Sequence, residues 1–209
     1  MSDNSPAVQD RRTTYHHGDL RGHLLSVVRD LVELHGPEGF SVAEAARRAG
    51  VSTAAPYKHF KDRNDLLNAL VSDAMDRLAL QMAQERDRHP KESIEAVAGI
   101  GKAYIDFAKT EPGIFRLMFG LTEGQEEDDG LQEKGEACFE IVVRACAGYL
   151  GAEAAPEAAA RSAYILWTSV HGHAFLSIDN KNKTEAKALE DWDFLMTVAR
   201  AILAETAAS

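Results

Sequence analysis

Apolar side chains recur every three or four residues through most of this 209-residue sequence. That spacing gathers them on one face of an α-helix, whereas a half-buried strand needs apolar and polar residues to alternate. We find no alternating segment and no internal repeat of about 20 to 50 residues. The sequence therefore predicts an all-α fold of about nine helices, separated by short stretches rich in glycine, proline and acidic residues.

The chain divides into three expected segments. Residues 1–14 are polar and form an N-terminal arm, which is either a flexible leader or a partner-contacting arm. Residues 15–78 form a three-helix head, whose first helix starts at the N-cap Asp19 and ends at His35 and Gly36. Residues 79–209 form a helical body. A long fourth helix begins at Asp62 and runs out of the head, either as a lever or as a plain connection.

The stretch 41–60 reads as two short helices joined by a tight turn. Ser41 and Glu44 have the spacing of a capping box, and Gly50 stands where a left-handed residue ends a helix. A second helix is expected from Ala54, with Pro56 tolerated in its first turn. This pattern is typical of the helix-turn-helix, whose second helix enters the major groove of DNA. An αα-hairpin in an ordinary bundle has the same spacing, so both interpretations stay open at this point.

Residues 50–67 resemble the DNA-binding signature of the tetracycline-repressor (TetR) family, and the similarity extends over 15–78. The resemblance implies a helix-turn-helix head joined by the fourth helix to an effector-binding and dimerisation domain. It also implies that Tyr57, His59 and Arg63 contact phosphates. The DNA-binding residues expected from the resemblance and from their donor groups are Thr53, Ala54, Ala55, Tyr57, Lys58, His59, Lys61 and Arg63. In the body, Trp167, His171 and Gly172 resemble a tryptophan, histidine, glycine signature of some family members.

The net charge of −10 is unevenly distributed along the chain. Residues 11–65 hold nine Lys and Arg against seven Asp and Glu, whereas residues 66–209 hold 14 against 24. An acidic body is repelled by DNA and helps to turn a mildly basic head toward it. Because the head is only weakly basic, we expect it to bind operator DNA as a homodimer.

Aromatic and sulfur-containing side chains are frequent in the body and are candidates to line a cavity for a small apolar effector. They are equally suited to a filled core, and for any single residue the core is the commoner outcome. The candidate effector-binding residues are Tyr104, Phe107, Phe115, Met118, Phe119, Phe139, Tyr164, Trp167 and His171.

The helix expected at 157–178 has two apolar faces, so it needs two partners. We assign the larger face to the body's own core and the narrower face, rich in small residues, to a second subunit. A helix expected at 188–202 pairs with it, which gives a four-helix interface. The candidate dimer residues are Ile165, Ser169, Gly172, Leu176, Leu195 and Ala199.

Other classes of function lack their signatures. The sequence has no phosphate-binding glycine loop, no Gly-x-Ser-x-Gly elbow and no His-Glu-x-x-His motif, so we predict no catalytic site, cofactor or metal. Cys138 and Cys146 are expected to be buried small residues. No apolar run reaches about 18 residues and no secretory signal is seen, which indicates a cytoplasmic protein without a membrane partner. We predict a transcriptional regulator, most simply a repressor that an effector releases from its operator. The alternative is an all-helical dimer that binds small molecules or proteins without DNA.

Overall fold

The computed structural model describes residues 19–120, 129–151, 155–179 and 189–207. These residues form eight α-helices and two short 3₁₀-helices, and no strand occurs among them, so the all-α prediction is confirmed. The α-helices are α1 (Leu20–His35), α2 (Val42–Arg48), α3 (Arg63–Arg86), α4 (Ile94–Thr110), α5 (Pro112–Phe119), α6 (Asp129–Leu150), α7 (Pro156–Ile178) and α8 (Asp191–Ala207). The 3₁₀-helices are η1 (Pro37–Gly39) and η2 (Pro56–Lys58). The predicted arm at 1–14 lies outside the described residues.

The one missing α-helix is the second helix of the predicted helix-turn-helix. It is a series of tight turns around η2, in which Ala55 N donates to Ser52 O at 3.0 Å and Lys58 N donates to Ala55 O at 3.2 Å. Pro56 has no amide hydrogen and therefore cannot make the α-helical bond to Ser52. This local change accounts for the difference between nine predicted and eight observed α-helices.

The predicted N-cap residues and helix-ending glycines are present in the structure. Asp19 caps α1 by accepting from Gly22 N, Ser41 caps α2 by accepting from Glu44 N, and Asp62 caps α3 by accepting from Asp65 N. The carboxylate of Glu44 does not complete a capping box, because it binds Arg48 within α2 instead. Gly36 and Gly50 both have a positive φ, the conformation that lets glycine end a helix.

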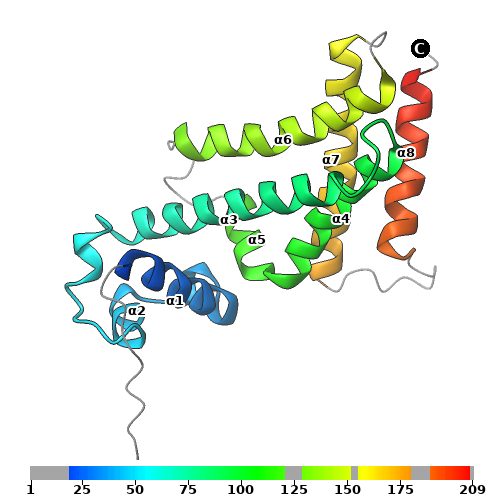
Figure 1. Cartoon of the computed structure of the whole chain (residues 1–209). Helices are drawn as coiled ribbons and strands as arrows, with labels where there is room; N and C mark the ends of the chain where they lie inside the picture. The colour runs from blue at the N-terminus through cyan, green and yellow to red at the C-terminus, as the bar shows by residue number, and fades with distance from the viewer. Residues whose placement is uncertain (1–18, 121–128, 152–154, 180–188, 208–209) are drawn as a thin grey trace, which may run out of the picture.

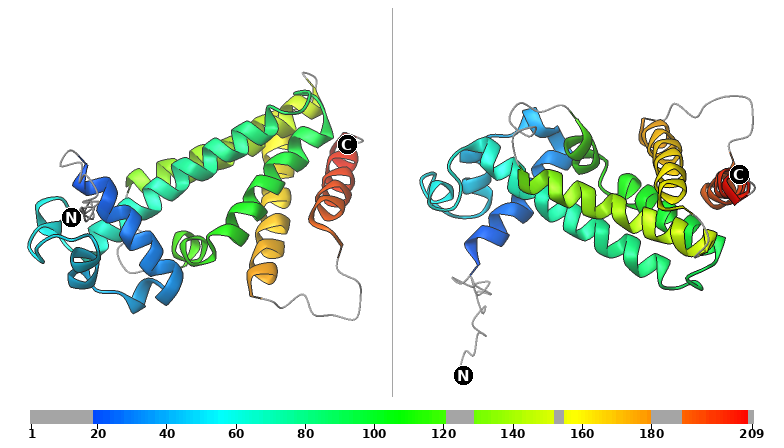
Figure 2. Two further views of the ribbon diagram at one scale, coloured as in Figure 1. Left: turned by 60° about the horizontal axis from the view of Figure 1, so that its bottom comes forward. Right: turned by 90° about the horizontal axis from the view of Figure 1, so that it is seen from above.

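Figure 1 shows the head, with α1 and α2, at one end of α3, which runs from it into the body. At about 1.5 Å per residue, the 24 residues of α3 span about 36 Å. Both views in Figure 2 place α6 alongside α3, and α7 and α8 stand side by side at the end far from the head.

One hydrophobic cluster continues from the head into the body. Leu24 and Phe60 belong to its head end, and Leu203 belongs to its far end. The predicted boundary after residue 78 lies within α3, where Leu78 is itself buried in this cluster. The hydrophobic core is therefore continuous across the predicted boundary. The division into a DNA-binding head and an effector-binding body remains a prediction.

Candidate nucleic-acid interface and apolar cavity

The turns around η2 present a row of polar side chains to solvent. Thr53, Ala54, Lys58 and His59 are exposed, and the Tyr57 side chain is 58% exposed although it is aromatic. Lys61, which precedes α3, is also exposed, whereas Ala55 is partly buried. Hydroxyl, imidazole and ammonium groups of this kind are donors for phosphate oxygens and base edges.

Two buried residues hold this row in place. Pro56 and Phe60 lie on the inner side of the element, and both belong to the buried part of the head. The Pro56 carbonyl accepts from His59 N at 2.9 Å and from Phe60 N at 3.0 Å, which closes the turn that carries Tyr57 and Lys58. Arg21 of α1 lies over the Phe60 ring, 5.4 Å from its centroid. The exposed row therefore sits on a packed support.

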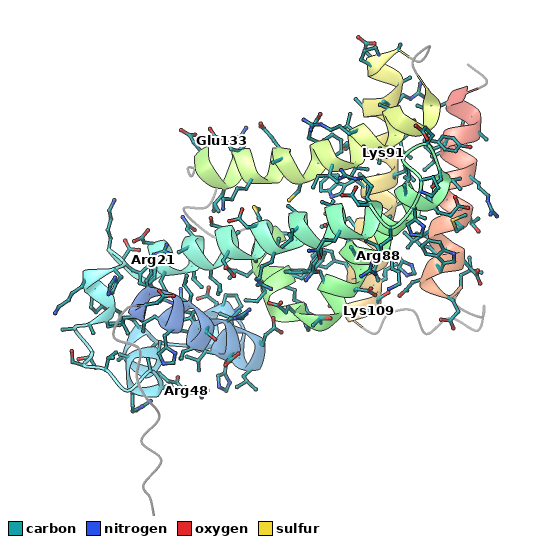
Figure 3. The ribbon with its side chains drawn as sticks, viewed as in Figure 1. Arg21, Arg48, Arg88, Lys91, Lys109 and Glu133 are labelled. Atoms are coloured by element: carbon teal, nitrogen blue, oxygen red, sulfur yellow. The ribbon has the colours of Figure 1, made fainter. Side chains whose placement is uncertain are left out.

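Arg63 makes contacts within the head that the sequence did not predict. Its guanidinium lies 5.1 Å from the centroid of the Phe40 ring and donates to the Pro37 carbonyl, with Glu38 at 3.7 Å. These contacts tie the start of α3 to the connection between α1 and α2. Because the two polar contacts share one guanidinium nitrogen and the side chain is 31% exposed, the assignment of Arg63 as a phosphate contact stays a prediction. Figure 3 shows two other head arginines, Arg21 and Arg48, on the ribbon of the same end.

A cavity of about 540 Å³ lies in the body between α3, α4, α5, α6 and α7. Ligand sites in proteins commonly have volumes of about 300 to 1,000 Å³ and mostly apolar walls. Six of the nine candidate effector residues line it: Tyr104, Met118, Phe119, Phe139, Tyr164 and Trp167. Their assignment as effector contacts remains a prediction.

Phe107, Phe115 and His171 do not line this cavity, which corrects their assignment as wall residues. Phe107 is buried in the core with the Arg77 guanidinium 5.4 Å from its ring centroid. The Phe115 ring packs behind the wall, 5.3 Å from Tyr104 and 5.0 Å from Phe119 between centroids. The ring of His171 also packs against Phe119, with 4.8 Å between the ring centroids.

A hydrogen bond between two side chains lies behind the cavity wall. The Tyr104 hydroxyl and His171 Nδ1 are 2.7 Å apart. Burial raises the pKa of Tyr104 and lowers the pKa of His171. Both groups are therefore uncharged at neutral pH.

Several wall residues were not predicted as effector contacts. α3 contributes Met75, Leu78 and Met82, and α6 contributes Cys138 and Val142. The apolar stripe of α3 was the available signal, but a stripe does not show which of its residues face a filled core and which face a cavity. Cys146 is buried as predicted, whereas Cys138 is only partly buried and its pKa is raised by burial to about 11.

A carboxylate from the head holds the start of the helix that forms one cavity wall. Glu33 of α1 accepts from Gly113 N at 3.0 Å and from Ile114 N at 2.7 Å, so it caps α5 from outside. A Cβ at Gly113 would lie only 2.8 Å from Val32 O, which shows how closely α1 and α5 approach. Arg77 of α3 binds Glu111 at the same helix start. Glu33 therefore links the head to α5, which lines the cavity, and the sequence had not predicted this link.

The candidate dimer residues separate into two groups. On α7, Ile165 and Leu176 are 39% and 47% exposed, and a Cβ at Gly172 would meet no atom within 4 Å. On α8, Leu195 and Ala199 are buried within the chain, and Leu195 packs against Gly101. This corrects their assignment to a subunit interface, because their side chains are already covered by α4. Ser169 is partly buried and donates to the Ile165 carbonyl.

The buried face of α7 is made mostly of small residues. It consists of Ala159, Ser162, Ala163, Leu166, Val170 and Ala174, whereas Tyr164 is 59% exposed. The buried hydroxyl of Ser162 is satisfied by the Thr206 hydroxyl of α8 at 2.9 Å. The large aromatic residues of α7 therefore face the cavity side and the surface, and small residues make the helix contacts.

Neither a metal-binding cluster nor a membrane-spanning helix occurs among the described residues. No group of three or more His, Cys, Asp or Glu side chains within them is arranged to hold a metal ion. In the same part of the chain, no helix is long and apolar enough to cross a membrane.

Two segments of the sequence match domains of known regulatory proteins. Residues 24–70 match "Bacterial regulatory proteins, tetR family", and residues 97–199 match "Tetracyclin repressor-like, C-terminal domain". An HTH-type transcriptional regulator of Mycobacterium tuberculosis is 32% identical over 87 residues, which is 41% of this chain and 37% of that protein. The chain thus aligns with little more than a third of the length of this curated relative.

Solved structures extend the similarity to the whole fold. A protein of unknown function from Rhodococcus sp. RHA1 is 28% identical, with a TM-score of 0.79 over 92% of this chain and 98% of that chain. The transcriptional regulator FadR of Bacillus subtilis, solved with stearoyl-CoA, has a TM-score of 0.65 at 12% identity, over 89% of this chain and 97% of that chain. At that identity the second likeness concerns the fold alone.

Proposed function

Because the chain belongs to the TetR family of bacterial regulatory proteins, we propose that it is a sequence-specific DNA-binding transcriptional regulator that acts as a homodimer. The observation that carries this proposal is the exposed row from Thr53 to Lys61, which follows α2 in the place of the second helix of a helix-turn-helix and is held by buried Pro56 and Phe60. In proteins of this type, the second element of the motif enters the major groove.

A homodimer supplies what a single head lacks. The head carries little net positive charge, so a single copy offers few phosphate contacts. Two heads related by a two-fold axis reach half-sites about one DNA turn apart, or about 34 to 36 Å. The exposed apolar face of α7 at Ile165 and Leu176 is the surface we propose for the partner subunit.

The proposal predicts a steep salt dependence of DNA affinity. If the dimer makes about 6 to 10 phosphate contacts, affinity should fall about 10³- to 10⁵-fold between about 50 and 200 mM salt, because each contact releases counterions. Fluorescence anisotropy with a labelled duplex measures this directly. Affinity independent of salt, or no binding at low salt, would favour the alternative of a helical dimer without DNA.

We further propose that the protein is a repressor and that a small apolar effector occupies the cavity. The aromatic and sulfur-containing wall supports this proposal, as does a fold that in FadR accompanies a bound stearoyl-CoA. An effector can release DNA only if it binds the released arrangement more tightly, and the coupling is typically about 1 to 3 kcal/mol.

Two connections can carry this coupling from cavity to head. α3 lines the cavity with Met75, Leu78 and Met82 and starts next to Lys61. α5 lines it with Met118 and Phe119, and its first turn is held by Glu33 of the head. An effector that displaces α5 would therefore also move α1 through the Glu33 hydrogen bonds, in addition to tilting α3.

Replacing Glu33 with Gln should loosen the contact between α1 and α5. The amide offers a single acceptor oxygen, so one of the two partly buried N–H groups of α5 is left unpaired, at a cost of about 1 to 3 kcal/mol. We expect faster amide hydrogen exchange at Gly113 and Ile114 and a lower free energy of unfolding in urea. Asp30→Asn, an exposed change on the same helix, is the control. Equal exchange rates in both variants would show that Glu33 does not secure the joint.

A further inference from the structure

The charged groups in the cavity wall are all acidic. Glu136 and Glu140 lie one turn apart on α6 and both line the cavity, while the lining residues include no lysine or arginine. The remaining wall is aromatic, aliphatic and sulfur-containing. A ligand in this cavity thus meets negative charge and no positive charge from the wall.

The other ionisable groups around the cavity do not alter that balance. Burial raises the pKa values of Tyr104 and Cys138 and lowers the pKa of His171, so all three are neutral near pH 7. Two basic residues of α6 lie close to this wall: Lys134 is bound to Asp76 of α3, and Arg144 is bound to Glu140. Both are thus already paired with carboxylates.

Aromatic rings stand next to the two glutamates. Phe139 precedes Glu140 on α6, and its ring centroid is 6.2 Å from that of Trp167, which in turn lies 6.3 Å from Tyr164. The faces of such rings attract cations, and the attraction grows where water is excluded. The two glutamates and the aromatic wall are together complementary to a ligand that carries a positive group on an apolar skeleton.

The present partners of the glutamates are easily exchanged. Glu136 accepts from Gln132 at 2.9 Å and Glu140 pairs with Arg144 at 2.9 Å, both within α6. Exposed pairs of this spacing contribute little to stability, so an entering cation can compete for the carboxylates. An entering carboxylate, by contrast, would lose hydrating water beside two like charges and find no lysine or arginine among the lining residues.

We infer that the effector is a lipophilic cation, an amine or quaternary ammonium on an apolar body. The inference rests on the proposed function in taking this cavity as the effector site. The body is acidic, with 14 basic against 24 acidic residues over 66–209. Its long-range electric field therefore also favours a cationic ligand.

Three probes with the same alkyl chain separate charge from hydrophobicity: decyltrimethylammonium, decanoate and 1-decanol, each used below its aggregation limit. Isothermal titration calorimetry of the full chain without DNA measures their affinities. We expect the cation to bind at least about tenfold more tightly than decanoate, a difference of about 1.4 kcal/mol, with the alcohol between them. Decanoate binding as tightly as the cation, or none of the three binding, would overturn the inference.

Two sets of variants locate the preference. Glu136→Gln combined with Glu140→Gln should weaken cation binding about tenfold and leave 1-decanol binding within about twofold. Glu133→Gln is the matched control, because Glu133 is exposed on the same helix, does not line the cavity and points away from α3 in Figure 3. A double variant that keeps full cation affinity would contradict the assignment.

DNA binding is measured separately from these titrations, so the two proposals can fail independently. Selective cation binding with no effect on operator affinity would contradict the proposed effector function and leave the charge preference of the cavity standing. Operator release by decanoate, but not by the cation, would support regulation and overturn the cationic class.

Discussion

Replacing Tyr57 and Lys58 together with alanine is expected to weaken operator binding about a thousandfold. Both side chains are exposed on the turn that Pro56 and Phe60 hold against the head, so the dimer would lose four proposed contacts. At about 1 kcal/mol for each contact, the loss is about 4 kcal/mol. Removing one Lys58 contact in each subunit should also lower the slope of log affinity against log salt by about 2.

The double variant should remain folded, because neither side chain belongs to the hydrophobic core. Helical circular dichroism and urea unfolding check this, and anisotropy with labelled operator measures affinity. Lys91→Ala is the matched control, since Lys91 is an exposed lysine at the far end of α3 from the head (Figure 3). A folded double variant with unchanged affinity would rule out the η2 surface as the DNA contact.

Gly172→Arg is expected to convert the dimer to a monomer and to abolish operator binding with it. A Cβ at Gly172 meets nothing within 4 Å in the single chain, so arginine is tolerated there without a partner subunit. In the proposed interface along Ile165 and Leu176, the same arginine would be buried unpaired between two helices. Burying an unpaired charge costs several kcal/mol, enough to separate the subunits at micromolar concentration.

Sedimentation velocity reports the oligomeric state, and the same preparation is then tested for operator binding. Ala137→Arg places arginine at an exposed position on α6 that lines neither the cavity nor the proposed interface, and it should leave the dimer intact. A Gly172→Arg protein that still sediments as a dimer would mean that the subunits meet elsewhere.

The sequence predicts best the features that depend on a few neighbouring residues. The caps at Asp19, Ser41 and Asp62 and the positive φ at Gly36 and Gly50 follow from side-chain chemistry within one turn. The 3₁₀ form of the recognition element was missed, although Pro56 removes the amide that an α-helical bond would need. The contacts of Arg63 within the head were not predicted, because its partners Pro37 and Phe40 lie more than twenty residues away in the sequence.

The cavity could be predicted only in part. Its wall is drawn from five helices, and whether an aromatic residue faces the space or the core depends on the rotation of each helix about its axis. Phe115 and Phe119 lie one turn apart on α5, yet only Phe119 lines the cavity. Leu195 and Ala199 were assigned to a second subunit because the sequence does not show that α4 covers them.

The central claim is that the exposed row on η2 reads a specific DNA site, and selection from genomic DNA tests it most directly. The purified protein is mixed with genomic fragments from its host at moderate salt, and the retained fragments are sequenced. We predict that the wild-type protein enriches a few fragments that share paired half-sites, with centres about 10 base pairs apart or a multiple of that spacing, and that the Tyr57→Ala, Lys58→Ala protein does not. Retention of unrelated fragments, or the same enrichment by both proteins, would contradict this claim.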